Sequence, residues 1–78
     1  MARFYFPIYD GGVTEDHEGV DLPNLDAARA HAIRGARALA AVTALEGRLA
    51  LSHRVEILNE IWVRVGIVTF ADAVEILP

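Results

Sequence analysis

The segment from residue 25 to residue 46 constrains the fold most, because it is rich in alanine and has helix signals at both ends. Asn24 precedes it as a suitable N-cap, Asp26 places negative charge in the first turn, and Gly47 follows as a C-terminal cap. We therefore expect one helix over residues 25–46, about 33 Å long. A helical step of about 100° per residue places one stripe of mostly small side chains on a single face: Leu25, Ala28, Ala32, Ala36, Leu39 and Thr43. Such a stripe lets the helix lie close to a sheet.

Before this helix, alternating side chains and turn signals predict short strands. Residues 3–9 are expected to form the first strand, at a sheet edge or bulged, because Pro7 has no N–H to donate. Asp10-Gly11-Gly12 favours a hairpin turn, after which residues 13–15 are expected to begin the returning strand. A second polar turn at residues 16–19 then leads to a short alternating stretch at residues 20–22. The face of the first strand that meets the helix is expected to hold Phe4, Phe6 and Ile8.

After the helix, residues 53–59 and 62–70 predict two more strands, joined by a turn at Asn59-Glu60. The side chains expected to face the helix from these strands are Val55, Ile57, Val63, Val65 and Ile67. Gly66 is a candidate bulge. The predicted order is β-β-α-β-β: an α+β fold with an antiparallel sheet and one long helix packed on one face, as a single domain over residues 1–78.

The chain carries more apolar side chains than one helix on one sheet face can cover, because hydrophobic residues make up 54% of it. The opposite sheet face is then expected to present an apolar and aromatic set: Tyr5, Tyr9, Leu58, Trp62, Val68 and Phe70. Large exposed apolar patches mark interfaces. This set predicts self-association, as a homodimer joined through the open sheet face or an edge strand. The alternative is that the tail, residues 74–77, folds over the same face.

The net charge of −4 argues against nucleic-acid binding, and a protein is the alternative partner. All the basic residues are arginines, and three of them lie along the predicted helix: Arg29, Arg34 and Arg37. Arginine favours bidentate contacts with phosphates and carboxylates, so these three are a candidate partner-binding surface. The alternative is an ordinary solvated helix face.

The residues give little support for catalysis. Cysteine is absent, which excludes disulfides and thiolate chemistry, and the neighbours Ser52 and His53 do not by adjacency form a catalytic pair. His17 stands among carboxylates at Asp16 and Glu18, which leaves a metal-binding or small-molecule-binding protein as an alternative, but the spacing fits no metal motif and a solvated acidic turn accounts for it. We expect no enzyme activity and no cofactor.

Neither a secretory signal nor a membrane-spanning stretch is visible. The longest apolar runs without a charge, residues 38–45 and 65–71, are far shorter than the roughly 20 residues that cross a bilayer. We therefore expect a soluble cytoplasmic protein.

Three blocks of sequence resemble a family of short bacterial proteins classed as a domain of unknown function. The first block is Arg3-Phe4-Tyr5-Phe6 with Asp10-Gly11-Gly12. The second is Asp16-His17-Glu18-Gly19-Val20-Asp21-Leu22-Pro23-Asn24-Leu25-Asp26-Ala27-Ala28-Arg29. The third is Arg54-Val55-Glu56-Ile57 with Phe70-Ala71-Asp72-Ala73-Val74-Glu75-Ile76. The resemblance covers nearly the whole chain and implies no activity.

The chain departs from that family's pattern at two places. Pro7 replaces a polar residue of the first strand, and Ile61-Trp62 stands where the last hairpin usually has a small, glycine-containing turn.

A second resemblance, at the level of the fold, is to antitoxins of the HicB type, through Leu22-Pro23 and the alanine-rich helix. The sequence does not specify a biological role. It favours a non-catalytic interaction module that self-associates through its sheet, and an antitoxin-like or regulatory protein that binds another macromolecule is an alternative.

Overall fold

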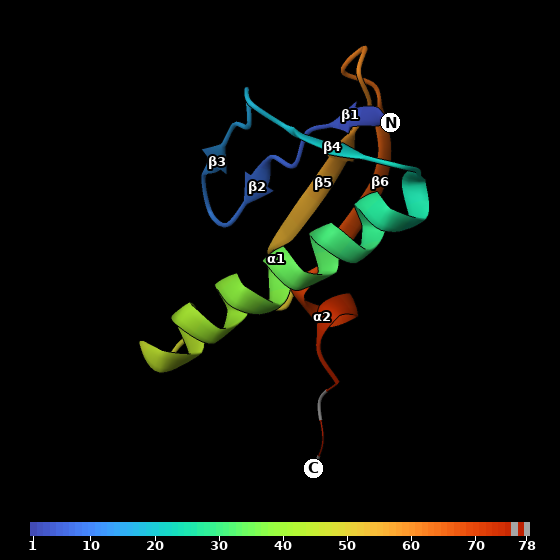
Figure 1. Cartoon of the computed structure of the whole chain (residues 1–78). Coiled ribbons are helices and arrows are strands. Elements are labelled where there is room, and N and C mark those ends of the chain that lie inside the picture. Colours follow the sequence, from blue (N-terminus) through green and yellow to red (C-terminus); the bar gives the residue numbers. More distant parts are fainter. Residues whose placement is uncertain (76, 78) are drawn as a thin grey trace.

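The computed structural model describes residues 1–75 and 77, and its elements form an α+β fold (Figure 1). In chain order they are β1 (Ala2–Phe4), β2 (Ile8–Tyr9), β3 (Val13–Thr14), β4 (Val20–Leu22), α1 (Leu25–Leu45), β5 (Arg54–Leu58), β6 (Arg64–Thr69) and α2 (Phe70–Ala73). One four-stranded antiparallel sheet has the order β3-β2-β5-β6, and β1 pairs with β4 in a separate two-stranded ribbon. The predicted fold class is confirmed, with α1 crossing one face of the sheet.

The first predicted strand, residues 3–9, is divided into two. β1 pairs with β4, Tyr5 forms an isolated bridge with Leu58, and β2 then pairs with β3 and β5. The division falls around Pro7, which cannot donate to a ladder but accepts the N–H of Glu56 with its carbonyl at 3.0 Å. The partner therefore changes from β4 to β5 between Phe4 and Tyr5, and Pro7 removes one hydrogen bond from the ladder with β5.

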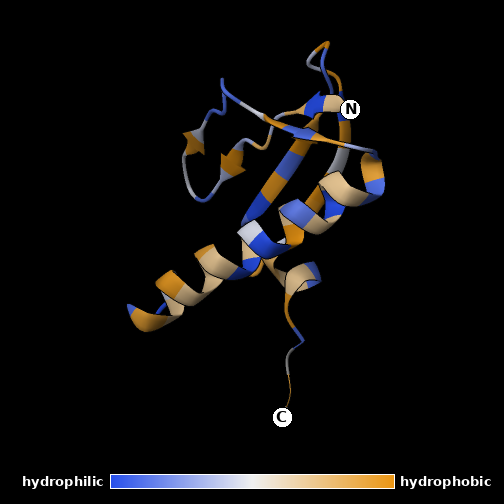
Figure 2. Ribbon diagram, in the orientation of Figure 1, coloured by the Kyte–Doolittle hydropathy of each residue, from blue (hydrophilic) through white to orange (hydrophobic). Residues whose placement is uncertain are grey.

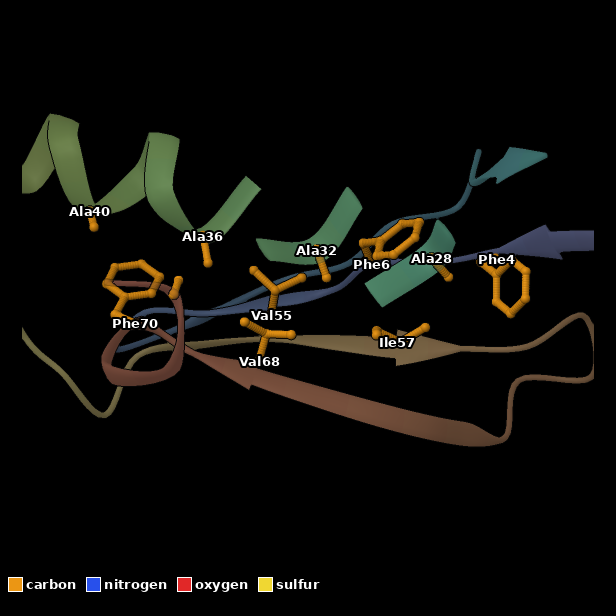
Figure 3. Packing of buried hydrophobic residues seen from close by; sticks show 11 residues of the cluster. Phe4, Phe6, Ala28, Ala32, Ala36, Ala40, Val55, Ile57, Val68 and Phe70 are labelled. Atoms are coloured by element: carbon orange, nitrogen blue, oxygen red, sulfur yellow. The ribbon is translucent and has the colours of Figure 1, made fainter. Parts of the chain in front are cut away.

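Helix α1 begins where the sequence predicts and ends one residue early. The side chain of Asn24 accepts the N–H of Ala27 at 2.8 Å, and Gly47 adopts a φ of +81° just beyond the end. The buried stripe is Ala28, Ala32, Ala36 and Ala40, which all point at the sheet (Figure 3). The predicted stripe is confirmed at its three alanines, whereas Leu25 is exposed because it precedes the part of the helix that lies over the sheet.

The core fills the space between α1 and the sheet (Figure 3). Its larger members come from four strands or their flanks and from the start of α2: Phe4, Phe6, Val55, Ile57, Val68 and Phe70. Phe4, Phe6, Val55 and Ile57 lie where the sequence predicts them. The fully buried residues of the helix are all alanines, with Ile33 and Leu39 packed at the margin of the core. The phenyl rings and branched side chains of the facing layer therefore supply most of the buried volume.

The face assigned to β6 is wrong. Val68 and Phe70 are buried in the core, while Val63 and Val65 are exposed. Val68 lies opposite Val55 and Gly66 lies opposite Ile57, so Gly66 and Val68 share the helix-facing side. Both faces of this segment carry apolar side chains, so its alternation does not say which face is inside. A shift of one residue then exchanges the two faces, and the register has such a shift between Ile57 and Leu58.

The short helix α2 attaches the end of the chain to α1. Thr69 and Asp72 form a capping box at its start, and Arg37 donates from Nε to the carbonyl of Ala73 at 2.6 Å. Val74 then packs against the buried core. The predicted alternative, in which residues 74–77 cover the outer sheet face, is therefore wrong at Val74, and its residue 76 lies outside the described residues. Neither described helix is long and apolar enough to cross a membrane.

Candidate interaction surface

The outer face of the sheet, which points away from α1, holds four of the six residues that the sequence proposed as an interface. Tyr5 lies directly opposite Leu58, and both alternate with core residues, so they face outward. Tyr9 and Trp62 lie on the same side and line the same groove as Leu58. Val68 and Phe70 do not belong to this set, because their side chains are 0% and 1% exposed in the core. The outer face is therefore less apolar than predicted.

Charged side chains occupy the middle of this face. Arg54 places its guanidinium 4.2 Å from the centre of the Tyr9 ring, and its Nε lies 3.0 Å from Oε2 of Glu56. Arg64 approaches the same oxygen at 3.5 Å. Glu56 is only 6% exposed beneath these two arginines. A buried carboxylate that keeps both partners is difficult to desolvate further, so the centre of the face is poorly suited to an apolar contact.

The free edge of the sheet at β6 is also protected. Strand β6 begins at the register shift opposite Leu58, which bends the edge, and the N–H of Thr69 at its other end donates to Asp72 rather than to solvent. Phe70 donates to the carbonyl of His53, so the ladder toward β5 uses the even-numbered residues. This alternation leaves Ile67 with its backbone groups toward the open edge. The edge is therefore interrupted at both ends, by the register shift at Leu58 and by the capping of Thr69.

The turn between β5 and β6 is rigid and apolar. Asn59 holds it through its side-chain oxygen, which accepts the N–H groups of Ile61 and Val63, each at 3.0 Å. Four residues in this turn and at the start of β6 are exposed, at 76%, 51%, 50% and 37%: Ile61, Trp62, Val63 and Val65. We call these four residues the apolar tip. The turn projects beyond the β1–β4 ribbon (Figure 1), so the apolar tip is free of the core.

Trp62 adopts a left-handed backbone conformation, with a φ of +63°. This region costs a residue with a Cβ about 1–2 kcal/mol, which is why glycine is its usual occupant. The family that the sequence resembles usually has a glycine-containing turn at this place. The positive φ explains this preference, because glycine adopts it without strain. A bulky residue is held here at an energetic cost, and the strain identifies Trp62 as a candidate functional residue.

Part of that cost is offset by stacking on Tyr5. The two ring centres are 4.0 Å apart and the planes are inclined by 21°, which is an offset-stacked arrangement. Trp62 nevertheless remains half exposed. One face of the indole is therefore used within the chain, and the remaining surface is available to a ligand.

A groove runs beside this aromatic pair, and we call it the Trp62 groove. Its volume is about 330 Å³, within the range of small-ligand sites. The apolar part of its lining is Pro7, Tyr9, Val13, Leu58 and Trp62. Its polar rim is Glu15, Asp16 and His17. The β2–β3 hairpin brings the rim beside β5, because Val13 lies directly opposite Tyr9 (Figure 1).

Asp16 fixes the loop that carries the rim. Its two carboxylate oxygens accept the N–H groups of Phe6 at 2.9 Å, Glu18 at 3.2 Å and Gly19 at 3.0 Å. Burial by itself would raise the pKa of Asp16, but these three donors and the nearby His17 outweigh it and hold the pKa below its ordinary value. Asp16 is thus a structural residue that keeps its negative charge at the groove.

The remaining rim residues contact each other. His17 places Nε2 3.0 Å from Oε2 of Glu15, and its ring centre lies 6.3 Å from that of Trp62. This contact is an ion pair only when His17 is protonated. Over residues 1–75 and 77, no three His, Cys, Asp or Glu side chains gather as metal ligands. The metal-binding alternative built on His17, Asp16 and Glu18 therefore gains no geometric support.

Two of the three helix arginines face α2. Arg37 is engaged with the carbonyl of Ala73. The pKa of Asp72 is lowered first by the backbone and hydroxyl donors of Thr69, and its small further lowering comes from the charge of Arg29. Arg34 is exposed on the helix. The arginines predicted to bind a partner are thus partly used to hold the end of the chain.

Comparison with protein families finds a match that covers most of the chain. Residues 3–71 match the family described as a domain of unknown function, DUF6894. The chain belongs to this family. No curated protein and no solved structure matches it. The resemblance seen in the sequence is confirmed, and a function for this member of DUF6894 has to be inferred from its own residues.

Sequence reasoning misses several residues of the Trp62 groove. It places Pro7, Val13 and Glu15 only in strands or turns, but they line the groove beside the aromatic side chains. The turn residues Asp10-Gly11-Gly12 could have placed Val13 in the groove, because a tight hairpin at this point brings Val13 opposite Tyr9. Placing Glu15 near Trp62 requires the tertiary fold, since no local pattern relates residues that far apart.

Proposed function

We propose that this DUF6894 protein is a non-catalytic interaction module that forms a homodimer through the apolar tip. The observation that carries the proposal is the exposure of Ile61, Trp62, Val63 and Val65 in the hydrogen-bonded β5–β6 turn and the start of β6. Scattered single apolar residues are normal on a surface, whereas a run of them that projects from the fold is typical of a contact site. A twofold dimer would let each tip cover the other.

The rest of the sheet supports this choice of contact. The centre of the outer face holds Arg54, Glu56 and Arg64, and the β6 edge is bent at one end and capped at the other. Neither offers a continuous apolar surface. The apolar tip buries less area than a standard stable interface, so the dimer should be weak and in rapid exchange with the monomer.

The proposal that the protein is not an enzyme is supported by the surroundings of its few reactive side chains. Ser52 is exposed in a turn, and the ring of His53 packs edge-on against Phe70 with centres 5.6 Å apart. The Nδ1 atom of His53 is buried without a hydrogen-bond partner. A general base needs a hydrogen bond that orients it, and this ring is held by packing instead.

Sedimentation velocity over a range of protein concentrations tests the homodimer. The wild-type chain should shift from monomer to dimer as concentration rises. Ile61→Lys should weaken the association at least tenfold, because a charge would be desolvated at the centre of the contact. Its stability should change by less than about 0.5 kcal/mol, because Ile61 is 76% exposed.

Val42→Lys is the matched control, since Val42 is also exposed but lies on α1. It adds the same charge and should leave the association unchanged. A wild-type chain that stays monomeric at its highest soluble concentration would refute the homodimer. A dimer that survives Ile61→Lys and is lost in Val42→Lys would place the contact at the end of α1 instead.

A further inference from the structure

The Trp62 groove combines two features that a purely apolar contact does not need. Its wall includes the rings of Tyr9 and Trp62, and its rim carries the carboxylates of Glu15 and Asp16. Aromatic faces attract cations through their quadrupole, and nearby carboxylates add a Coulombic attraction. An anionic ligand would meet both carboxylates, and a neutral apolar ligand would make no use of them.

The described lining of the groove holds two carboxylates, one histidine and no arginine. Three backbone donors and the nearby His17 hold the pKa of Asp16 below its ordinary value, so this carboxylate keeps its negative charge. Among the described residues, Glu15 forms one ion pair, with His17, and its side chain is 70% exposed. Nearby Arg54 has its own carboxylate partner in Glu56. The groove is therefore complementary to a positive charge.

The chain itself shows which cation its aromatic side chains accept. The guanidinium of Arg54 lies 4.2 Å from the centre of the Tyr9 ring. A guanidinium is planar and weakly hydrated, so it stacks on a ring more readily than an ammonium does. The exposed surface of Trp62 offers a similar ring surface to a second guanidinium, one that this chain does not provide.

We propose that the Trp62 groove binds an arginine side chain presented by an extended segment of a partner protein. The aliphatic stem of that arginine lies on Pro7 and Leu58, and the guanidinium stacks on Trp62 with its donors toward Glu15. The left-handed backbone of Trp62 has a purpose in this arrangement, because it holds the indole at the groove. Glycine, the usual residue in that conformation, would leave no aromatic ring there. This site includes Trp62 of the apolar tip but not Ile61, so the arginine and a second copy of the chain would compete for Trp62.

Fluorescence titration with blocked tripeptides tests the site directly, because Trp62 is the only tryptophan in the chain. The probe is acetyl-Ala-Arg-Ala-amide, and its matched control replaces arginine by citrulline, which has the same shape without the charge. The arginine peptide should change the Trp62 emission at concentrations at least fivefold lower than the citrulline peptide. Equal responses to the two peptides, or none to either, would overturn the proposal.

Two variants test the residues of the site. Glu15→Gln should weaken binding of the arginine peptide about twofold to fivefold, as expected for an exposed ion pair, and should reduce its salt dependence. Glu75→Gln removes the same charge from the end of the chain beside α1 and should have no effect. A loss of binding that is the same in both variants would show a general effect of net charge and reject the site.

A third variant separates binding from folding. Trp62→Gly restores the residue that suits a positive φ, so the thermal midpoint should stay close to that of the wild type, while the peptide-dependent NMR shifts of Leu58 and His17 amides should disappear. Shifts that persist in Trp62→Gly would show that the indole is not part of the site. Titrating Ile61→Lys in parallel distinguishes the two proposals, because it should bind the peptide normally even where self-association is lost.

Discussion

Gly19 occupies the tightest place in the loop between β3 and β4. Its φ is +71°, and a Cβ built on it would lie 2.7 Å from the carbonyl oxygen of Phe4. No flexible side chain can move away to relieve that contact, because the oxygen belongs to the backbone of β1. The neighbouring N–H of Gly19 is also one of the donors to Asp16. A single residue therefore holds the loop against β1 and helps to fix the rim of the Trp62 groove.

We predict that Gly19→Ala lowers the free energy of unfolding by about 3 kcal/mol, because backbone strain and a backbone clash act together. Gly11→Ala is the matched control. Gly11 also has a positive φ, of +97°, but a Cβ added there would meet no atom within 4 Å, so strain alone should cost about 1–2 kcal/mol. Urea denaturation measures both. Equal losses in the two variants would show that the contact with Phe4 is unimportant.

At the scale of the element, α1 depends on the small size of its buried side chains. Ala32 is 1% exposed and lies over the core beside Val55 and Phe6 (Figure 3). A larger side chain would push the helix away from the sheet. The last turns of α1 are also hydrophobic (Figure 2), but their apolar side chains, Val42 and Leu45, are exposed.

We predict that Ala32→Leu destabilises the protein by about 1–3 kcal/mol through overpacking. Ala30→Leu makes the same change at an exposed position of the same helix and should alter stability by less than about 0.5 kcal/mol. Thermal unfolding followed by circular dichroism compares the two. A neutral Ala32→Leu variant would mean that the gap between helix and sheet is wider than the burial indicates.

The elements differ in how far the sequence predicts them. Helix α1 follows from local signals, since Asn24 and Gly47 mark its ends without reference to the rest of the chain. Strand β6 does not, because Val65 and Val68 are both apolar and the choice of inner face depends on the pairing with β5. Pro7 signals the interruption of the first strand, but the change of partner from β4 to β5 falls before it, between Phe4 and Tyr5, and depends on where β4 lies. Local chemistry thus predicts ends and turns, while pairing requires the whole fold.

At the scale of the molecule, the excess of apolar side chains is real, but its location differs from the prediction. The expected sheet-face patch loses Val68 and Phe70 to the core and is divided by Glu56 with its arginines. The exposed apolar residues gather instead at the apolar tip and along the last turns of α1. Composition predicts that the excess exists. Only the pairing of β5 with β6 determines which side chains form it.

The whole molecule should lose stability in acid through Asp16 and Asp72, whose pKa values lie below their ordinary value of 3.8. A lowered pKa means that the folded state binds protons less readily than the unfolded chain. The stabilisation is therefore complete above about pH 5, and it is lost as the pH falls below about 4 and through the folded pKa. Urea denaturation between about pH 7 and pH 2.5 should show this decline.

The variant Asp16→Asn should remove part of that dependence. It should cost about 1–2 kcal/mol at neutral pH, because the N–H groups of Phe6 and Gly19 lose a charged acceptor, and its stability should fall less than that of the wild type on acidification. Asp10→Asn is the control, since Asp10 is exposed at the start of the turn between β2 and β3. An unchanged acid profile in Asp16→Asn would remove this residue as the cause.

The alanine stripe of α1 has a consequence for how this family can evolve. The four buried alanines of α1 face the larger core side chains across the space between helix and sheet, so the side-chain volume of one layer cannot change without a change in the other. A descendant that acquires a larger residue at position 28, 32, 36 or 40 has to shed an equivalent volume from Val55, Ile57 or Val68. Substitutions at the two sets of positions should therefore arise as compensating pairs, whereas the solvent side of the same helix diverges freely.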